Sequence, residues 1–207
     1  MKSNDDEEHG EAIGPPSEIV YKLKYKWTFW YVPSGDREKS WTDKLTKLFT
    51  VGTVQEFWRF YLNVLPPSKL STGSDYYFFK DGINPTWEDP ANESGGRWTY
   101  TIDKQERAQK LDNLWVKVLK ILICGQFKEM DDLVCGAVVN LRSKSDKVVL
   151  WTNKECGSNA EAIRHIEDLF ITNLGLSPTQ VRYEPHPSPE KPAVKVDPPP
   201  VEVLVSP

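Results

Sequence analysis

Histidine and the motifs of common enzymes are scarce in this chain of 207 residues. Its three histidines, His9, His165 and His186, do not stand in a pattern in which one of them could activate a nucleophile. The Gly-rich phosphate loop G-x-x-x-x-G-K-[ST] does not occur. Glu88 and Asp89 are adjacent carboxylates, but neighbours in sequence seldom face one substrate as an acid–base pair. The sequence therefore predicts a binding protein rather than an enzyme, and no cofactor is expected.

Cysteine is also rare, and long apolar runs are absent. Cys124, Cys135 and Cys156 do not have the spacing of a zinc site, so no metal is expected. Unpaired cysteines fit a reducing compartment, which predicts a cytoplasmic protein, with the nucleus as a second location. No apolar run approaches the ~20 residues that span a membrane. The acidic residues Asp5 to Glu8 stand where a secretory signal would be basic, so we expect a soluble protein.

An excess of basic charge is missing as well, since the formal net charge is −4. Sequence-independent nucleic-acid binding needs many cations on phosphates, so any nucleic-acid contact must be local. Tryptophan, in contrast, is abundant, with eight residues. Because this side chain offers a large, flat and rigid apolar face, its abundance indicates a stacking surface.

The composition divides the chain into one domain between two tails. Residues 1–20 are acidic, and residues 185–207 hold eight of the sixteen prolines, so both segments are predicted to be disordered. The proline-rich tail is either solvated low-complexity sequence or a docking segment for a proline-reading module. Residues 21–184 are predicted to form one domain with a single core. Nothing in the pattern requires more than a monomer.

Hydrophobic periodicity predicts an α+β fold with three helices and five strands. Thr53 and Glu56 form a capping box before the first helix, and Asp103 with Glu106 opens the second. Asn159 can cap the third helix. The apolar stripes are Val54, Phe57, Trp58, Tyr61, Leu62 and Leu65; Leu111, Leu114, Trp115, Val118 and Leu122; and Ile163, Ile166, Leu169 and Phe170. Strands are predicted at 26–32, 76–80, 97–102, 134–142 and 147–152.

The last two strands are predicted to form a hairpin around the turn 143–146. This register places Arg142 opposite Lys147, and by the same count Asn140 opposite Val149 and Val138 opposite Trp151. One face then carries Asn140, Arg142, Lys147 and Trp151, and the other carries Cys135, Ala137, Val139, Leu141, Val148 and Leu150. Two like charges across a hairpin indicate a phosphate site, with a solvated hairpin end as the alternative.

Two predicted loops each present a tryptophan. Trp87 lies in the segment 82–90, which Gly and Pro punctuate, and Trp41 follows the loop 33–40. Such residues either fold back onto a core edge or serve as a binding platform. A carboxylate such as Glu88 can accept from both donors on the edge of guanine. Methylation at N7 makes that base cationic, which strengthens stacking on tryptophan by ~1–2 kcal/mol.

The chain resembles the eukaryotic translation initiation factor 4E cap-binding proteins over roughly residues 21–186. The motifs that carry the resemblance are WTFWY (27–31), TVQEFW (53–58), FKDGI (79–83), PTWED (85–89), GGRW (95–98), CGAVVNLR (135–142) and KVVLWT (147–152).

The resemblance implies a curved antiparallel β-sheet backed by three α-helices on its convex face, with the cap-binding slot on the concave face. Trp41 and Trp87 would sandwich the 7-methylguanosine base. Glu88 would read the edge of the base, the Trp87 backbone N–H would meet its carbonyl, and Trp151 would lie against the added methyl group. The resemblance assigns the cap phosphates to Arg142 and Lys147, with Arg97 assisting through water and Lys144 reaching further along the RNA.

The resemblance also implies a role in translation initiation, because Trp27 and Trp41 are both tryptophan, as in initiation-type members. Such proteins bind the scaffold factor 4G and the 4E-binding proteins through a Tyr-x-x-x-x-Leu-apolar helix of the partner. The matching positions on the convex surface are Leu23, Val54, Trp58, Val116 and Gly125.

This surface departs from the family pattern. Tyr21-Lys22-Leu23 stands where His-Pro-Leu is usual, Lys117 replaces an acidic residue, and the stretch from Trp115 to Gly125 is one residue longer. A cap-binding competitor or repressor with weakened scaffold binding is therefore an alternative function. A peptide-binding module lined by tryptophan is a third hypothesis, although it gives Glu88 and the cations no joint task. The sequence does not decide between mono- and trimethylated caps.

Overall fold

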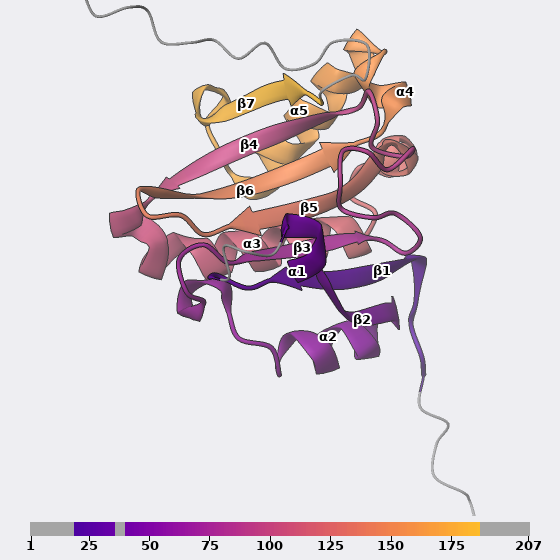
Figure 1. The fold of residues 1–207 in the computed structure, drawn as a ribbon. Coiled ribbons are helices and arrows are strands. Elements are labelled where there is room, and N and C mark those ends of the chain that lie inside the picture. Colours follow the sequence, from indigo (N-terminus) through magenta and orange to yellow (C-terminus); the bar gives the residue numbers. More distant parts are fainter. Residues whose placement is uncertain (1–18, 36–39, 187–207) are drawn as a thin grey trace, which may run out of the picture.

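Seven antiparallel strands form one twisted sheet in the part of the chain that the computed structural model describes, residues 19–35 and 40–186 (Figure 1). Their order across the sheet is β2-β1-β3-β5-β6-β4-β7. The strands are β1 (Lys22–Val32), β2 (Thr46–Thr53), β3 (Asp75–Lys80), β4 (Gly96–Asp103), β5 (Val134–Asn140), β6 (Ser145–Thr152) and β7 (Val181–Pro185). The predicted α+β class and the five predicted strands are confirmed.

The two strands that the periodicity did not predict, β2 and β7, are the edges of the sheet. An edge strand has one neighbour and is less buried, so its apolar residues need not alternate with polar ones. In β2 the first four residues, from Thr46 to Phe49, are all exposed. β7 has only five residues and ends on Pro185.

Three long helices lie on one face of the sheet, as predicted. They are α2 (Val54–Tyr61), α3 (Arg107–Ile123) and α5 (Ala160–Leu174), and α3 runs behind the strands in Figure 1. Thr53 and Glu56 form the predicted capping box, and the Asn159 side chain accepts from the N–H groups of α5. Helical backbone begins at Lys104, directly after Asp103 as predicted, but as a 3₁₀ turn that leads into α3, and the Asp103 side chain forms no capping hydrogen bond.

The remaining helical segments are short. The single-turn helices α1 (Trp41–Lys44) and α4 (Lys154–Gly157) were not predicted, and 3₁₀ turns cover Pro67–Lys69, Lys104–Glu106, Lys128–Leu133 and Pro178–Gln180. None of the helices within the described ranges has the length and apolar character needed to cross a bilayer.

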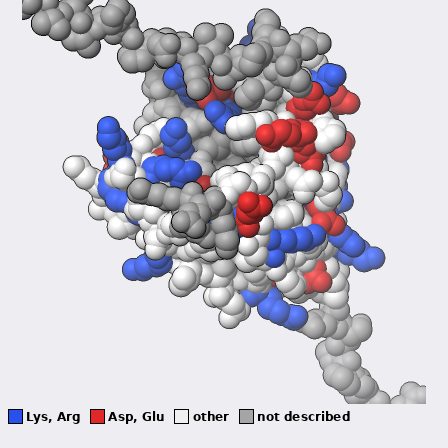
Figure 2. All heavy atoms as spheres, in the orientation of Figure 1, with Lys and Arg blue, Asp and Glu red and all other residues white. Residues whose placement is uncertain are grey.

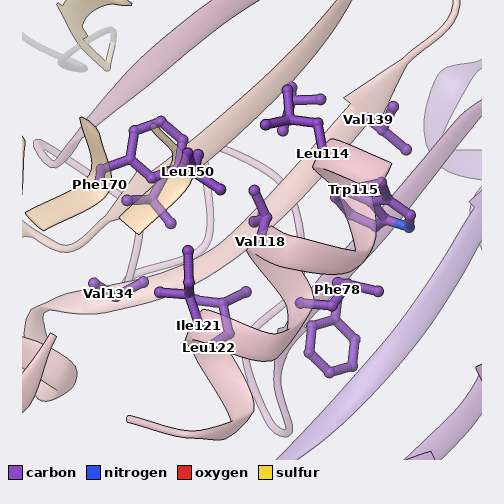
Figure 3. Packing of buried hydrophobic residues seen from close by; sticks show 14 of the residues in the cluster. Phe78, Leu114, Trp115, Val118, Ile121, Leu122, Val134, Val139, Leu150 and Phe170 are labelled. Carbon is purple, nitrogen blue, oxygen red and sulfur yellow. The ribbon is translucent and has the colours of Figure 1, made fainter. Parts of the chain in front are cut away.

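The main core lies between the sheet and the three long helices. Figure 3 shows Trp115, Val118 and Leu122 of α3 packed toward Phe78 and Val139 of the sheet. Trp27, whose identity as tryptophan supported an initiation-type member, is 2% exposed in this core and stacks on Phe78 with ring centroids 5.1 Å apart. Trp27 therefore stabilises the core on the helical face of the sheet and does not reach the concave face.

The register predicted for the β5–β6 hairpin is wrong by two residues. Lys147 pairs with Asn140 instead of Arg142, and Val149 pairs with Val138. The reason is Asp146, which is fully buried and accepts hydrogen bonds from the Arg142 backbone N–H and the Arg107 guanidinium. These contacts draw Asp146 into the strand and leave residues 141–144 as the turn. A shift by two residues does not by itself move a side chain to the other face of the sheet.

Cys135 is the exception to the predicted faces. The pairing of β5 with β6 shifts between Val134 and Gly136, and Cys135 joins the apolar cluster on the concave side. A bulge of this kind reverses the direction of a side chain, which alternation alone cannot anticipate.

The folded part also extends beyond its predicted end. Pro185 belongs to β7, and His186 is 5% exposed, although both were assigned to the C-terminal tail. The other predicted tail residues, 1–18 and 187–207, lie outside the described residues, and residues 19 and 20 form a short exposed segment before β1.

Candidate functional site

A cavity of 680 Å³ opens on the concave face of the sheet, opposite the three long helices. This volume is in the range of small-molecule sites in proteins. Its wall includes seven of the eight side chains that the sequence assigned to ligand binding: Trp41, Trp87, Glu88, Arg97, Arg142, Lys147 and Trp151. Lys144, the eighth, is exposed on the β5–β6 turn and does not line the cavity.

Trp41 is held at the mouth of the cavity by the first turn of α1. Ser40 caps this helix by accepting a hydrogen bond from the Asp43 N–H at 3.2 Å. The indole Nε1 of Trp41 donates to the Tyr77 hydroxyl at 3.2 Å, and the two rings meet at 73° with centroids 5.7 Å apart. One hydrogen bond and one edge contact thus fix the orientation of a partly exposed indole.

Trp87 and Glu88 are presented by the segment between β3 and β4, residues 81–95, which we call the Trp87 loop. Trp87 is 49% exposed, an unusual position for a large apolar ring, and Glu88 is exposed beside it. No hydrogen bond within the described ranges engages the Trp87 backbone N–H. The neighbouring Asp89 has a structural task, because its carboxylate accepts from Asn84 N at 2.8 Å and Ala91 N at 3.0 Å.

Trp151 forms part of the cavity floor. It lies on β6, is 7% exposed, and contacts Phe79 and His186 at centroid distances of 5.6 and 4.3 Å. It belongs to a second apolar cluster, on the concave side, with Val138, Val149 and Phe79 as neighbours. This cluster provides an apolar floor between the aromatic and cationic sides of the cavity.

Four cations line the cavity: the three predicted ones, Arg97, Arg142 and Lys147, and Arg182, which forms an ion pair with Glu184 at 3.4 Å. The two terminal nitrogens of the Arg142 guanidinium donate to the Asp75 carboxylate, at 2.6 and 3.1 Å. Arg97 forms an ion pair with Glu184 at 3.1 Å. The Lys147 ammonium has no hydrogen-bond or ion-pair partner within the described residues, so it is available to an anionic ligand. Figure 2 shows Lys and Arg side chains gathered around one side of the hollow, and acidic side chains mainly on the other.

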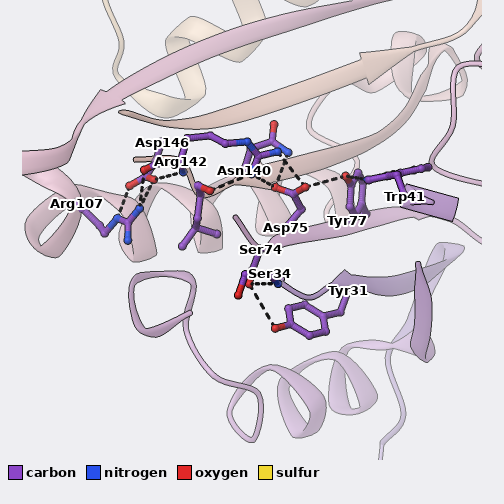
Figure 4. Close-up of polar contacts among 11 residues, drawn as sticks. Tyr31, Ser34, Trp41, Ser74, Asp75, Tyr77, Arg107, Asn140, Arg142 and Asp146 are labelled. Atoms are coloured by element: carbon purple, nitrogen blue, oxygen red, sulfur yellow. Dashed lines mark hydrogen bonds and ion pairs between the residues drawn. The ribbon is translucent and has the colours of Figure 1, made fainter. Parts of the chain in front are cut away.

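Asp75 and Tyr77 connect the two sides of the site, and the sequence reasoning did not single them out. Asp75 is 3% exposed and accepts from Arg142, from Asn140 Nδ2 at 2.9 Å and from the Tyr77 hydroxyl at 3.3 Å (Figure 4). Because Tyr77 in turn accepts from Trp41, one chain of hydrogen bonds runs from the Trp41 indole to the Arg142 guanidinium.

This network keeps Arg142 charged and Tyr77 neutral. The hydrogen bond to Asp75 raises the pKa of Arg142, and burial, followed by the nearby Asp75 charge, raises the pKa of Tyr77. Tyr77 therefore remains a neutral hydroxyl that donates to Asp75. The alternation of β3 carried the relevant signal, since it sets Asp75 and Tyr77 on one face, but nothing in the sequence showed that this face borders the site.

The residues predicted to bind a partner lie around α2, α3 and the start of β1. The Tyr21 backbone accepts from the Val54 N–H at 2.9 Å, which brings Leu23, Val54 and Trp58 into the same region. Trp58 and Val116 are half-buried, and Gly125 ends α3 with a positive φ of 61°. Tyr21, Leu62 and Leu65 are 60%, 75% and 60% exposed, so this surface has apolar groups accessible to a partner.

No group of three or more His, Cys, Asp or Glu side chains within residues 19–35 and 40–186 has the arrangement of a metal site.

Comparison with known proteins identifies the family. A model described as "Eukaryotic initiation factor 4E" matches residues 22–196. The human protein "Eukaryotic translation initiation factor 4E" is 41% identical over 181 residues, which cover 87% of this chain and 82% of that protein. Human "Eukaryotic translation initiation factor 4E type 1B" is 41% identical over 177 residues, covering 84% of this chain and 72% of the relative.

Solved structures are similar in sequence and in shape. The structure of Ascaris suum eIF4E-3 with m7G cap has a TM-score of 0.78 and 40% identity, covering 82% of this chain and 93% of that chain. The complex of C. elegans eIF4E-3 with the 4E-binding protein Mextli has a TM-score of 0.77 and 40% identity, covering 81% and 94%. The chain belongs to the eukaryotic initiation factor 4E family.

Proposed function

We propose that this protein binds the 7-methylguanosine cap at the 5′ end of messenger RNA and promotes translation initiation. The observation that carries the proposal is one cavity whose lining includes the tryptophans, the Glu88 carboxylate and the cations predicted to bind the cap: Trp41, Trp87, Trp151, Glu88, Arg97, Arg142 and Lys147. A related protein, Ascaris suum eIF4E-3, has been crystallised with m7G cap and also with m2,2,7G cap. Both caps are therefore candidate ligands.

The aromatic and acidic residues predicted to bind the base each have one role in this proposal. Trp41 and Trp87 stack on the two faces of the methylated base, whose positive charge favours an electron-rich ring. The Glu88 carboxylate accepts the two donors on the base edge, and the Trp87 backbone N–H donates to the base carbonyl. Trp151 lies against the methyl group.

The phosphates that follow the nucleoside lie on the cationic side of the cavity. Arg142 and Lys147 contact them directly, and Arg97 acts through water. Lys144, which lies outside the cavity, is left to contact RNA beyond the cap. The chemistry is binding without bond cleavage, and no cofactor takes part.

The protein acts, in this proposal, as a bridge between capped RNA and the scaffold factor 4G in the cytoplasm. A partner helix of the Tyr-x-x-x-x-Leu-apolar type docks near Val54, Trp58 and Val116. A relative, C. elegans eIF4E-3, forms a complex with the 4E-binding protein Mextli, which supports a second class of partner at this surface.

The assignment of Glu88 is tested by substitution and calorimetry. Glu88→Ala removes the acceptor of two base donors, so affinity for 7-methyl-GTP should fall by at least ~2 kcal/mol, about thirtyfold. The matched control is Glu93→Ala, which removes the same charge from the same loop but does not line the cavity. The control should change affinity by less than about 0.5 kcal/mol. Equal losses in both variants would mean that loop charge, and not edge recognition, is measured.

A repressor is the second candidate function. Lys22 and Lys117 are both exposed near the partner surface, and both depart from the family pattern. A cap-binding protein with weakened scaffold binding would sequester messages. Affinity for a 4G peptide that contains the Tyr-x-x-x-x-Leu-apolar helix separates the two functions. Affinity equal to that of an initiation-type relative would exclude the repressor.

A further inference from the structure

The Trp87 loop contains no strand and no α-helix, yet it must hold an exposed indole and a carboxylate in fixed positions. Its interior is filled by Asn92, which is 0% exposed. The Asn92 amide Nδ2 donates to the carbonyl oxygens of Asn84 at 2.8 Å and Thr86 at 2.7 Å. These two carbonyls flank the turn that leads into Trp87, so one side chain closes the loop from inside.

His186 connects this loop to the end of the folded chain. Its Nδ1 lies 2.8 Å from the Asn92 carbonyl oxygen, and its backbone N–H donates to the Gly95 carbonyl at 2.9 Å. A carbonyl can only accept, so Nδ1 must carry the proton. The His186 ring also rests against Trp151, with centroids 4.3 Å apart at 53°. One residue therefore contacts both the loop that carries Trp87 and the floor of the cavity.

Neither Asn92 nor His186 lines the cavity itself. His186 Nε2 and Asn92 Oδ1 are buried and have no hydrogen-bond partner among the described residues. Unpaired buried polar atoms are unfavourable, so packing alone would favour apolar side chains at both positions. The polar side chains of Asn92 and His186 are explained by the hydrogen bonds that they form, all of which are with residues of the Trp87 loop. Burial lowers the pKa of His186, which keeps the ring neutral.

We propose that Asn92 and His186 are positioning residues for base recognition, which together fix the Trp87 loop against Trp151 before the ligand arrives. This inference rests on the proposed function of the cavity. The end of β7 then determines how often the free protein has Trp87 and Glu88 in the binding arrangement.

The kinetic consequence differs from that of a lost ligand contact. When the binding-competent arrangement is less populated, the apparent association rate falls by that fraction, while contacts in the complex remain. His186→Phe keeps a ring against Trp151 but removes the donor to Asn92. His186→Asn keeps a donor but removes the ring. Asn92→Asp removes the two amide donors of the loop. The control is His165→Phe, since His165 lies on α5 next to Glu129 and lines neither the cavity nor the Trp87 loop.

Two measurements test the proposal. The first is hydrogen exchange of the loop amides of Asn84, Ala91, Asn92, Glu93 and Gly95, all of which are hydrogen-bonded. His186→Phe, which loses one hydrogen bond, and Asn92→Asp, which loses two, should exchange these amides at least about fivefold faster than wild type. Exchange in α3 should not change. His186→Asn should restore the wild-type rate to within about twofold.

The second measurement is stopped-flow binding of 7-methyl-GTP. His186→Phe and Asn92→Asp should bind about fivefold more slowly with an unchanged dissociation rate, and His165→Phe should match wild type. Unchanged exchange and association in His186→Phe would overturn the proposal, as would a loss confined to dissociation. If Asn92→Asp does not fold, the comparison of His186→Phe with His186→Asn is sufficient to test the proposal. If wild type does not bind 7-methyl-GTP, the proposed function fails, while exchange still tests the loop contacts.

Discussion

The side chains that line the cavity are held in place by a second set of residues behind them. Trp41 is oriented by Tyr77, Arg142 is held by Asp75, and Tyr77 donates to Asp75 (Figure 4). An aromatic or cationic group on a sheet surface would otherwise sample several rotamers, and ordering it on binding would reduce affinity. Preorganisation at the residue scale therefore supports recognition of the base.

Replacement of Tyr77 by Phe tests this role of the network. Tyr77→Phe removes the acceptor of the Trp41 indole while it keeps the ring. Affinity for the nucleoside 7-methylguanosine should fall about fivefold, because one hydrogen bond that orients Trp41 is lost. The nucleoside is the ligand of choice, since it lacks the phosphates that we propose Arg142 to contact.

Tyr76→Phe is the matched control, because Tyr76 points to the other face of β3, where its hydroxyl donates to Leu65 O at 3.2 Å. Tyr77→Phe loses two hydrogen bonds, with Trp41 and Asp75, and Tyr76→Phe loses one, so thermal unfolding should show the larger loss of stability for Tyr77→Phe. Only Tyr77→Phe should lose nucleoside affinity. Equal affinities of the two variants would show that the Tyr77 hydroxyl does not position Trp41.

At the scale of secondary-structure elements, the buried helices and strands could be predicted from the sequence and the edge strands could not. The three long helices and five inner strands were predicted because buried elements have strong periodicity. The edges β2 and β7 were not, because partial exposure removes that signal. The same limit applies to His186, whose contact with the Trp87 loop depends on the unpredicted strand β7.

The site shows a similar division. Trp41, Trp87 and Glu88 were indicated by their loops, and Arg142, Lys147 and Trp151 by one face of a hairpin whose register was wrong by two. This error did not affect the site prediction, because a shift by an even number of residues leaves side chains on the same face of the sheet. Asp75 and Tyr77 share one face of β3, but their roles could not be predicted because Arg142 and Trp41 are distant in the chain and are brought near only by the fold. Asn92 bonds to residues of its own loop, whose irregular backbone gives no periodic signal.

The helical side of the sheet allows a separate test of the two binding surfaces. Trp58 on α2 should be a main contact of a partner helix, so Trp58→Ala should weaken a Tyr-x-x-x-x-Leu-apolar peptide by ~2 kcal/mol or more. Affinity for 7-methyl-GTP should not change, because Trp58 packs on the opposite face from the cavity.

Trp87→Ala provides the reverse case, with loss of nucleotide binding and retention of the peptide. Both affinities can be measured on the same samples by fluorescence anisotropy with labelled ligands. Loss of both ligands in either variant, without loss of fold, would argue against two independent surfaces.

At the scale of the whole molecule, the charge beside the cavity is opposite in sign to the net charge of the chain. The chain has a formal net charge of −4, yet cations gather beside the cavity (Figure 2). Such a field favours a short anionic ligand without favouring nucleic acid generally. The protein should therefore bind capped RNA through the cap and its phosphates, and uncapped RNA weakly.

Salt dependence measures this electrostatic contribution. Affinity for 7-methyl-GTP should fall with increasing KCl, and Lys147→Ala should reduce the slope of log K against log salt by roughly one contact. Lys144→Ala should leave the slope unchanged for this ligand, since Lys144 is exposed on the same hairpin but outside the cavity. Identical slopes in the two variants would assign the effect to general surface charge.

The central claim is that the cavity recognises a methylated guanine between two tryptophans. It is tested most directly by quenching of intrinsic tryptophan fluorescence in parallel titrations with 7-methyl-GTP and GTP. We expect saturable quenching by 7-methyl-GTP with an affinity about five- to thirtyfold above that for GTP, because methylation adds a cation–π contribution of ~1–2 kcal/mol. Equal quenching by both nucleotides, or quenching by neither, would contradict it.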